Sequence, residues 1–305
     1  MAEYPAAEVA AVIVNYNAGG HLMDCVRSLR AEGVDEIVVV DNGSVDGSER
    51  AVAESEPDAV VLSQTRNRGY GGGANVGIRH SSAPLVLVCN PDLTVEPGAL
   101  KALVAALEAD ERRAVVGPRI VDPEGSLYPS ARTFPALGDA LGHALLGLIA
   151  PGNRWSRRYK LLDWDHAQPA EVDWVSGACF LARRVALDEL GGFDESYFMY
   201  SEDVDLCWRA WKAGWRIAYE PAATVVHVQG VSADRRPYRM IAEHHRSLFR
   251  FAWRTTEGPR RLLLPFVALG LALRAAMAAA QRLAEGPLER RRARLPASGP
   301  GGPLD

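Results

Sequence analysis

The sequence lacks the cysteine patterns that mark disulfide-rich or cysteine-ligated proteins. Its four cysteines, Cys25, Cys89, Cys179 and Cys207, stand far apart in apolar segments and form no closely spaced pair. A zinc site or a disulfide framework would need such pairs or a regular spacing. The pattern excludes both and is typical of a protein in the reducing cytoplasm.

Membrane and export signals are also missing. No apolar stretch runs uninterrupted for 18 residues, so no spanning helix is expected. The first apolar run, residues 9–14, has no basic flank and no cleavage site, so no signal peptide is expected either. The glycine-rich residues 69–75 have no Gly-Lys-Ser/Thr ending and do not follow the first strand, which excludes a P-loop and a dinucleotide fingerprint.

What the chain does have is the composition of a globular protein with an uneven charge. It has 305 residues, 48% hydrophobic and 24% charged, which allows one large domain or two small ones. Residues 1–230 carry 20 Lys/Arg against 32 Asp/Glu, whereas residues 231–305 carry 14 against 6. The basic tail suggests an anionic surface as partner. It is accompanied by no recognised nucleic-acid-binding module, so no nucleic-acid partner is expected.

Strands and helices are predicted to alternate from residue 9 to about residue 114. The predicted strands are residues 9–14, 37–40, 60–62 and 85–88. The predicted helices are the one marked by Leu22, Val26 and Leu29 and those at residues 48–56, 73–80 and 97–108. Continuous Val/Ile/Leu strands separated by helices predict an α/β fold, with a mostly parallel sheet and helices on both faces. Ligands of such sheets bind beyond the carboxyl ends of the strands.

Polar residues follow each of these four strands. They are Asn15-Tyr16-Asn17, Asp41-Asn42-Gly43-Ser44, Asn67-Arg68-Gly69 and Asn90-Pro91-Asp92. Each alone is also an ordinary turn, because turns use Asn, Asp, Gly and Pro. Together at one sheet edge they predict a nucleotide site in which Asp41 accepts from a pyrimidine N–H or a ribose hydroxyl. Asp92 is placed to hold a divalent cation against phosphates. The glycine-rich stretch after Arg68 lets the backbone approach a ligand.

A second cluster of polar residues lies at residues 201–212. Val204, Cys207, Trp208 and Trp211 recur at helical spacing, so a helix is predicted to begin near Ser201. Its first turn carries Glu202, Asp203 and Asp205. Carboxylates at a helix start are common, because the exposed N–H groups favour negative charge there. In a partly apolar cleft, however, a carboxylate can act as a general base.

In this order, these motifs resemble those of an inverting family-two glycosyltransferase with the GT-A fold. The motifs are Val-Ile-Val-Asn-Tyr-Asn (12–17), Asp-Asn-Gly-Ser (41–44), Asn-Arg-Gly-Tyr-Gly-Gly-Gly-Ala-Asn (67–75), Asn-Pro-Asp (90–92), Trp-Val-Ser-Gly-Ala-Cys (174–179) and Glu-Asp-Val-Asp-Leu (202–206). The resemblance covers about residues 8–250. Residues 117–132 and 197–200 are similar to those of bacterial rhamnosyltransferases that act on polyprenyl-diphospho-N-acetylglucosamine.

The resemblance implies a role for particular residues. Asp203 would be the catalytic base, and Asp92 with His227 would hold Mg²⁺ or Mn²⁺. The donor site implied is Val14, Asn15, Tyr16, Asp41, Asn67, Arg68, Gly69, Asn75, Asn90 and Asp92. The acceptor site implied is Trp174, Ser176, Gly177 and Glu202. Without the family, a lone histidine after a strand and a tryptophan beside one are more often structural.

The chemistry implied is a single in-line displacement. An acceptor hydroxyl attacks the anomeric carbon of a nucleotide-diphospho-sugar, most simply dTDP-L-rhamnose, while Asp203 takes the proton. The usual Asp-x-Asp of the family is here Asn90-Pro91-Asp92, so one carboxylate is available and the donor diphosphate is expected to complete the metal site. The chain has no Gln-x-x-Arg-Trp segment, which processive relatives share, so one sugar per acceptor is expected.

The predicted domains are a GT-A domain at 1–257, a tail at 258–295 and a disordered end at 296–305. The GT-A domain divides into a nucleotide-binding half at about 8–113 and an acceptor-binding, catalytic half at about 114–257. The tail is predicted to be an amphipathic helix on the inner face of the cell membrane, which would make the enzyme cytoplasmic and peripheral and bring it to a lipid-linked acceptor.

Two features carry the prediction of a membrane-associating tail. The apolar run at residues 262–273 is too short to span before Arg274. Arg274, Gln281, Arg282 and Glu285 then form one polar stripe. The alternative is a helix pair that packs on the catalytic domain or on a second subunit, as in a homodimer.

Other functions remain open at this point. The donor could be a UDP-hexose or UDP-galactofuranose. A nucleotide-sugar pyrophosphorylase would share the sheet, but it is expected to begin with a glycine-rich basic loop, and Asn15-Tyr16-Asn17-Ala18 is not one. A non-catalytic sugar-binding module could keep the fold without needing Asp203, Asp92 and His227 together.

Overall fold

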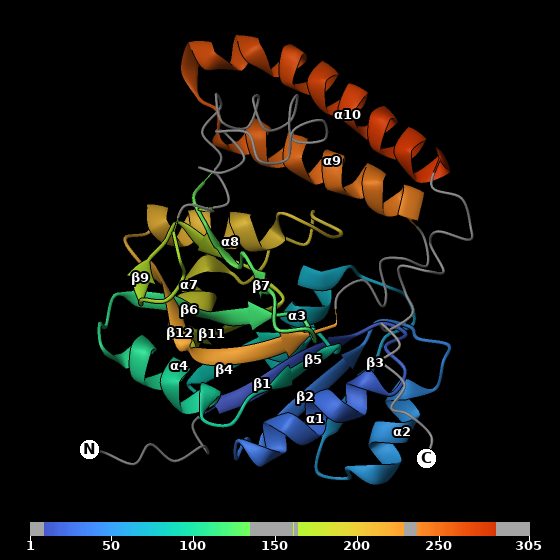
Figure 1. Ribbon diagram of the computed structural model, residues 1–305, viewed down its shortest axis with the longest axis vertical. Coiled ribbons are helices and arrows are strands. Elements are labelled where there is room, and N and C mark those ends of the chain that lie inside the picture. The colour runs from blue at the N-terminus through green and yellow to red at the C-terminus, as the bar shows by residue number, and fades with distance from the viewer. Residues whose placement is uncertain (1–8, 135–160, 162–163, 229–236, 285–305) are drawn as a thin grey trace, which may run out of the picture.

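A mixed sheet of ten strands runs through the described part of the molecule, with helices on both of its faces (Figure 1). The computed structural model describes residues 9–134, 161, 164–228 and 237–284. The strands are β1 Val9–Asn15, β2 Glu36–Asp41, β3 Val60–Ser63, β4 Leu85–Cys89, β5 Leu93–Val95, β6 Arg113–Val121, β7 Leu127–Tyr128, β8 Ala131–Arg132, β9 Ala170–Glu171, β10 Trp174–Val175, β11 Cys179–Arg183 and β12 Arg216–His227. The helices are α1 His21–Ala31, α2 Ser48–Ser55, α3 Tyr70–His80, α4 Ala99–Glu108, α7 Arg184–Leu190, α8 Glu202–Lys212, α9 Pro237–Thr255, the 3-10 helix η3 Gly258–Leu263 and α10 Leu264–Ala284.

The strand order is β3-β2-β1-β4-β11-β6-β12-β5, with β7 and β9 at the margins and β8 pairing β10 in a small second sheet. Strands β3, β2, β1 and β4 are parallel, as predicted. Strand β11 is inserted antiparallel between β4 and β6, and β12 runs parallel to β6. The sheet is therefore mixed and mostly parallel. The carboxyl ends of the predicted strands meet at one edge, where Asn15 lies opposite Asp41.

Two apolar clusters cover the two faces of the sheet. Side chains from alternate positions of β1, such as Ile13, pack with α1, α2 and α4. The positions between them, such as Val12, pack with α3, α7 and α8. Because a strand sends successive side chains to opposite faces, a continuous apolar run is buried on both sides. The run at residues 9–14 is buried throughout.

One predicted helix begins earlier than expected. The sequence predicted a helix at residues 73–80, whereas α3 begins at Tyr70 and takes in most of the glycine-rich stretch. These glycines allow close packing within the protein: a Cβ at Gly73 would lie 2.8 Å from Val14, and one at Gly77 would lie 2.3 Å from Val12. These glycines thus allow α3 to lie close to β1, and the approach of this backbone to a ligand stays a prediction.

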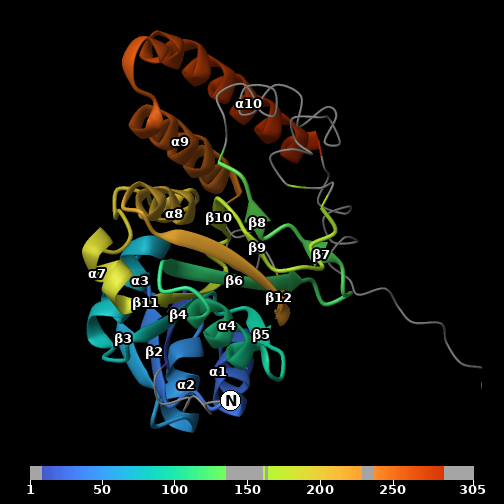
Figure 2. The ribbon, with the colours of Figure 1, turned by 90° about the vertical axis from the view of Figure 1, so that its left-hand side faces the viewer.

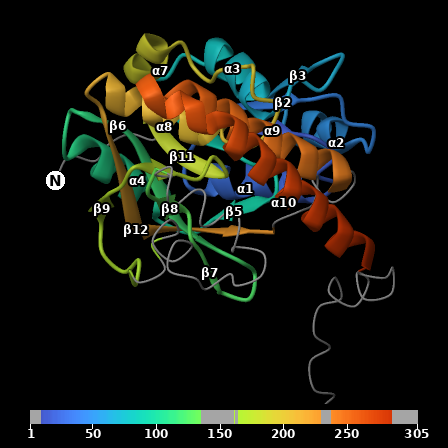
Figure 3. The same ribbon diagram turned by 90° about the horizontal axis from the view of Figure 1, so that it is seen from above.

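The C-terminal part forms a hairpin of α9 and α10 above α8 (Figure 2). Seen from above, the two helices lie across that end of the molecule (Figure 3). The apolar run at residues 262–273 belongs to a continuous helical segment, Gly258–Leu283, of 26 residues, which contains an 18-residue window with a mean hydropathy of 2.0. By length and composition this segment is long enough to cross a membrane, which corrects the expectation that it is too short. Residues 285–305, including the end predicted to be disordered, lie outside the described residues.

Candidate active site

Asp41 is the centre of a hydrogen-bond network at the carboxyl edge of the sheet. One carboxylate oxygen accepts from the side chains of Asn15 (2.8 Å) and Ser44, and the other accepts from the backbone N–H groups of Gly43 (3.1 Å) and Ser44 (3.0 Å). Asn15 is completely buried and also donates to Ser48 (2.9 Å). In this structure the Asn15 side chain holds Asp41, because a buried amide must find partners within the protein, and its contact with the donor stays a prediction.

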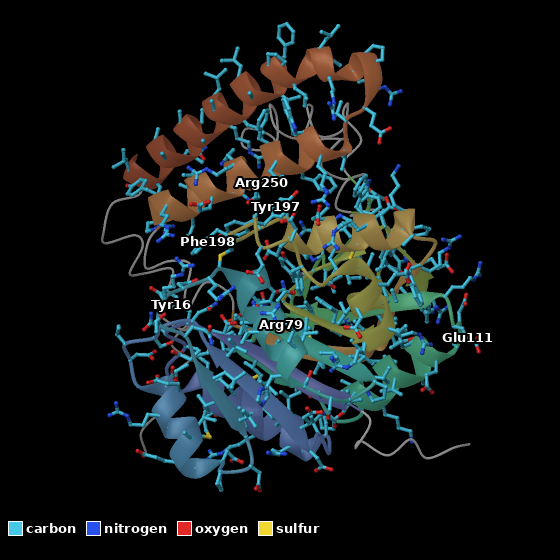
Figure 4. All side chains as sticks on the ribbon, turned by 180° about the vertical axis from the view of Figure 1, so that it is seen from behind. Tyr16, Arg79, Glu111, Tyr197, Phe198 and Arg250 are labelled. Carbon is cyan, nitrogen blue, oxygen red and sulfur yellow. The ribbon has the colours of Figure 1, made fainter. Side chains whose placement is uncertain are left out.

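Val14 and Tyr16 lie beside this network. Val14 is buried against α3, whereas Tyr16 is half-buried at the edge of the sheet (Figure 4). Tyr16 is thus the residue of the β1 end that offers a ring to a ligand. Its contact with the donor stays a prediction.

The predicted donor residues after β3 form a turn that joins the two halves of the chain. The Asn67 side chain accepts from Gly69 N–H (2.8 Å), and Gly69 has φ +80°. A Cβ at Gly69 would lie 2.1 Å from the carbonyl oxygen of Phe198, which accepts from Tyr70 N–H at 3.0 Å. Only glycine permits this contact between the nucleotide-binding half and the loop that leads to α8.

Asn75 and Arg68 also hold that loop. The Asn75 amide donates to Phe193 O (2.9 Å) and Glu195 (3.2 Å) and accepts from Phe193 N–H (2.8 Å). Arg68 pairs with Glu195 at 2.9 Å. Burial acts to raise the pKa of Glu195, but the hydrogen bonds from Arg68 and Asn75 outweigh it and lower that pKa. Asn75 was predicted to bind the donor, and in the structure its side chain braces the turn before α8.

The predicted metal ligands Asp92 and His227 are brought together from sequence positions 135 residues apart. His227 Nε2 lies 3.1 Å from Asp92 Oδ1 and 3.2 Å from Asn90 Nδ2, and Asp92 and His227 are both buried. Neighbouring ligands of an octahedral ion with bonds of about 2.1 Å lie about 3 Å apart, so this pair fits two adjacent positions around Mg²⁺ or Mn²⁺. Among the described residues no group of three His, Cys, Asp or Glu side chains could hold a metal. If this pair holds a metal, further ligands would have to come from a bound molecule or water.

Of the three carboxylates in the first turn of α8, Asp203 is the one in reach of a substrate. Asp205 is fully buried and paired with Arg209 at 2.7 Å. Glu202 is buried, and one of its oxygens has no partner among the described residues. Asp203 is half-buried, with one oxygen accepting from Gly177 N–H at 2.8 Å. The geometry therefore separates one accessible carboxylate from two internal ones.

Burial and mutual repulsion raise the pKa of this pair. Burial, with the neighbouring charge of Asp203, raises the pKa of Glu202 to about 8. Burial also raises the pKa of Asp203, while the N–H groups of Gly177 and Val204 and the charge of Arg132 act in the opposite direction. Burial therefore favours the protonated form of Glu202, while the backbone donors and Arg132 favour the charged form of Asp203.

The predicted acceptor segment lies under Asp203, but Trp174 is buried. Trp174 is 4% exposed, and its indole N–H donates to Thr133 O at 2.9 Å. This burial favours the structural alternative for Trp174, and its place in the acceptor pocket stays a prediction. Ser176 and Gly177 are also buried, and a Cβ at Gly177 would lie 3.1 Å from the Cβ of Asp203. Gly177 thus contacts Asp203 directly, whereas the Ser176 hydroxyl accepts from Ala178 N–H.

Arg132 is a site residue that the sequence reasoning missed. Its guanidinium lies over the rings of Trp174 (5.0 Å) and Tyr128 (5.4 Å), and it donates to the Tyr128 hydroxyl at 2.9 Å. Its charge acts to lower the pKa of Asp203, against the larger effect of burial. The sequence around Arg132 did not indicate this role, because the stacking of Arg132 on the two rings depends on the pairing of β8 with β10.

Comparison with known proteins identifies the family. The model of "Glycosyl transferase family 2" matches residues 10–191, and that of "Glycosyl transferase family group 2" matches residues 156–280. The chain belongs to glycosyltransferase family 2. This enzyme is 40% identical over 255 residues to N-acetylglucosaminyl-diphospho-decaprenol L-rhamnosyltransferase of Mycobacterium tuberculosis, covering 79% of this chain and 82% of the relative.

Two further matches place this glycosyltransferase more broadly. It is 29% identical to the low-salt glycan biosynthesis hexosyltransferase Agl10 of Haloferax volcanii, over 75% of this chain and 69% of that protein. A mannosyltransferase from Pyrobaculum calidifontis, solved with GDP-Man and Mn²⁺, superposes with a TM-score of 0.56 at 20% identity, covering 94% of this chain and 78% of that one. The shared fold confirms the GT-A architecture predicted from the sequence.

Proposed function

We propose that this glycosyltransferase moves a single L-rhamnose from dTDP-L-rhamnose to a lipid-linked acceptor, polyprenyl-diphospho-N-acetylglucosamine, in the synthesis of a cell-wall or surface polysaccharide. The observation that carries the reaction type is the half-buried Asp203, which accepts from Gly177 N–H and lies beside the buried Glu202. The observation that carries the substrates is the 40% identity to a rhamnosyltransferase over most of both chains.

The residues at the site support a single displacement with inversion. The acceptor oxygen forms a bond to the anomeric carbon as the bond from that carbon to the diphosphate oxygen breaks, and the acceptor proton passes to Asp203. Gly177 N–H fixes the direction of the receiving carboxylate. Asp92 and His227 would hold Mg²⁺ or Mn²⁺, which when bound supplies positive charge to the leaving diphosphate. The Mn²⁺ complex of the Pyrobaculum mannosyltransferase supports this metal requirement.

A donor panel tests the proposal. Purified enzyme is given dTDP-L-rhamnose, UDP-hexoses or UDP-galactofuranose with a short polyprenyl-diphospho-N-acetylglucosamine, in metal or in chelator, and products are read by mass. We expect transfer from dTDP-L-rhamnose in metal only. Transfer from another donor would keep the reaction as a glycosyl transfer but would change the sugar that is transferred. The likeness to a hexosyltransferase allows this outcome. Release of nucleoside triphosphate with added diphosphate would instead identify a pyrophosphorylase, and no reaction at all would favour a non-catalytic sugar-binding module.

We further propose that the tail, residues 258–295, seats the enzyme on the inner, cytoplasmic face of the membrane. Exposed apolar side chains recur along the outer side of η3 and α10 at Leu262, Phe266, Leu269, Leu273 and Met277. Of the 18-residue apolar window within Gly258–Leu283, 17% is buried. Water is a poor solvent for such a continuous apolar stripe, which marks a lipid or protein interface.

Charge supports a lipid surface as the occupant of this face. The exposed Arg260 and Arg261 lie at the start of the stripe. Arg274 is half-buried and close enough to His245 of α9 to lower its pKa, after the larger effect of burial. The polar side of α10 thus faces α9 and the apolar side faces outward, which suits a helix lying in the membrane surface. A homodimer through the same face is the competing arrangement.

A further inference from the structure

The loop before α8 has a backbone that its own sequence does not favour. Tyr200 and Ser201 adopt left-handed conformations in succession, with φ 69° and 63°, and neither is glycine. They directly precede Glu202 and Asp203, so their backbone sets the direction in which α8 begins. Left-handed non-glycine residues persist only where surrounding contacts hold them.

Helix α9 supplies contacts to this loop along its length. Ser247 Oγ donates to Met199 O at 2.9 Å, and the His244 ring meets the Tyr200 ring edge to face at 5.0 Å. Arg250 lies 5.7 Å above the ring of Tyr197 (Figure 4). Met199, which precedes the left-handed pair, is thus fixed by a hydrogen bond, and Tyr200, the first residue of the pair, is fixed by a ring contact.

Arg254 of α9 fixes the two ends of the same segment. Its guanidinium pairs with Asp194, before the loop, and lies 3.3 Å from Asp205 in the first turn of α8. Asp205 is fully buried and also binds Arg209. On the opposite side, Phe198 O accepts from Tyr70 N–H of α3. The loop is therefore held between the nucleotide-binding half and α9.

We propose that α9 is a positioning element of the transfer site, and that Ser247 and Arg254 are positioning residues that aim Asp203. This rests on the proposed role of Asp203 as base. The contacts of α9 give it a direct effect on the turnover rate, because displacing a catalytic group by about 1 Å can cost about a hundredfold in rate.

The test uses Ser247→Ala and Arg254→Lys in the full chain, with dTDP-L-rhamnose and a short-chain acceptor. We expect kcat to fall between about tenfold and a hundredfold while the KM and binding of the donor stay within twofold, because the donor contacts lie on the other half. We also expect the pH at which transfer reaches half its maximum to shift in Arg254→Lys, since the lysine does not keep the geometry of the Asp205 pair. The matched control is Arg246→Gln on the same helix, whose exposed side chain pairs only with Glu243 among the described residues.

Two results would overturn the inference. One is a kcat within twofold of the wild type in both variants, with an unchanged pH profile. The other is loss of kcat and donor binding in parallel with a loss of folded protein, which would make α9 scaffold only. Should Arg254→Lys fail to fold, Ser247→Ala decides, because it removes a single hydroxyl. Asp203→Asn separates this inference from the proposed function: full transfer by Asp203→Asn rejects the base itself, whereas inactivity of Asp203→Asn with active α9 variants rejects only the positioning role.

Discussion

At the residue scale, environment rather than residue type decides what each carboxylate of the Glu202–Asp203–Asp205 cluster can do. Asp205 is neutralised by two arginines, Glu202 is buried, and Asp203 alone is half-exposed beside a backbone donor. Three similar groups within four positions therefore lie in three different environments.

Replacing Asp203 by Asn is expected to lower transfer by about 10²–10⁴-fold, because the amide cannot take the acceptor proton. The amide oxygen can still accept from Gly177 N–H, so folding and donor binding should persist. Initial rates and donor titrations check this, with the exposed Asp58→Asn as control. Transfer near the wild-type rate would move the base to Glu202 or Asp205.

Glu202 is expected to make stability depend on pH. Its pKa is about 8 in the folded protein against a usual 4.5, so the folded state binds more protons between these values. The free energy of unfolding should therefore fall as pH rises from about 5 to 8, by up to about 1.4 kcal/mol per pH unit for one proton, and level off above that. Urea unfolding of wild type and Glu202→Gln measures the effect. If the free energy of unfolding changes equally with pH in both proteins, the proton is bound by a group other than Glu202.

Replacing Asp92 by Ala is expected to weaken donor binding in Mg²⁺ or Mn²⁺ and to have little effect in chelator, because the carboxylate acts through the metal. Calorimetric titration of donor under both conditions checks this without relying on turnover. Equal weakening with and without metal would mean that Asn90-Pro91-Asp92 only shapes a turn.

At the scale of elements, the active site depends on close approach between segments from different halves of the chain. Gly69 meets Phe198, Gly177 meets Asp203, and Asn75 holds the turn at Phe193. Each contact joins the nucleotide-binding half or the acceptor segment to the loop that carries the base. Gly69 and Gly177 are thus needed for close contact between elements rather than for the flexibility of a loop.

Replacing Gly69 by Ala should destabilise the protein by about 2 kcal/mol or more and lower transfer, since the new Cβ overlaps Phe198 O and φ +80° is strained for alanine. The control is Gly20→Ala, where φ is −66° and nothing lies within 4 Å, expected to change stability by less than about 1 kcal/mol. Chemical unfolding of both variants gives the comparison. Equal stability of the two would show that the Phe198 loop moves away easily.

At the scale of the whole molecule, the polar residues of the predicted donor site lie at the carboxyl edge of the sheet. The exposed apolar side chains of η3 and α10 lie on the other side of α8. The hairpin of α9 and α10 joins this apolar face to the catalytic loop (Figure 2). An enzyme whose acceptor sugar is attached to a lipid needs this arrangement, because the sugar stays near the membrane surface.

Replacing Phe266, Leu269 and Leu273 together by Gln should abolish binding to anionic liposomes and leave transfer to a short soluble acceptor within about threefold, since these side chains are exposed and lie outside the site. Liposome sedimentation measures the binding. Val45→Gln with Val185→Gln removes exposed apolar side chains elsewhere and should have no effect. The membrane proposal would be wrong if the wild-type protein does not bind liposomes and forms a dimer that the triple variant converts to monomers. That result would mean that the apolar face contacts a second subunit.

The sequence by itself determined the periodic features. Apolar runs of three to six residues between amphipathic segments indicate strands buried on both faces, so a parallel sheet of β1, β2, β3 and β4, its helices and the polar strand ends were predicted, although the order of the strands was not. The ordered motifs also identified the family, and the roles that it implies for Asp203, Asp92 and His227 stay predictions.

Tertiary structure decided what each polar residue touches. Asn15, Asn75 and Trp174 carry groups that would suit a ligand, yet all three are turned inward, because a buried amide or indole is stabilised by whichever partner packing brings within reach. Arg132 and α9 reach the base only through strand pairing and helix packing between positions distant in the chain. Local sequence sets backbone preference and periodicity, whereas exposure, charge state and contact depend on residues that meet only in the folded chain.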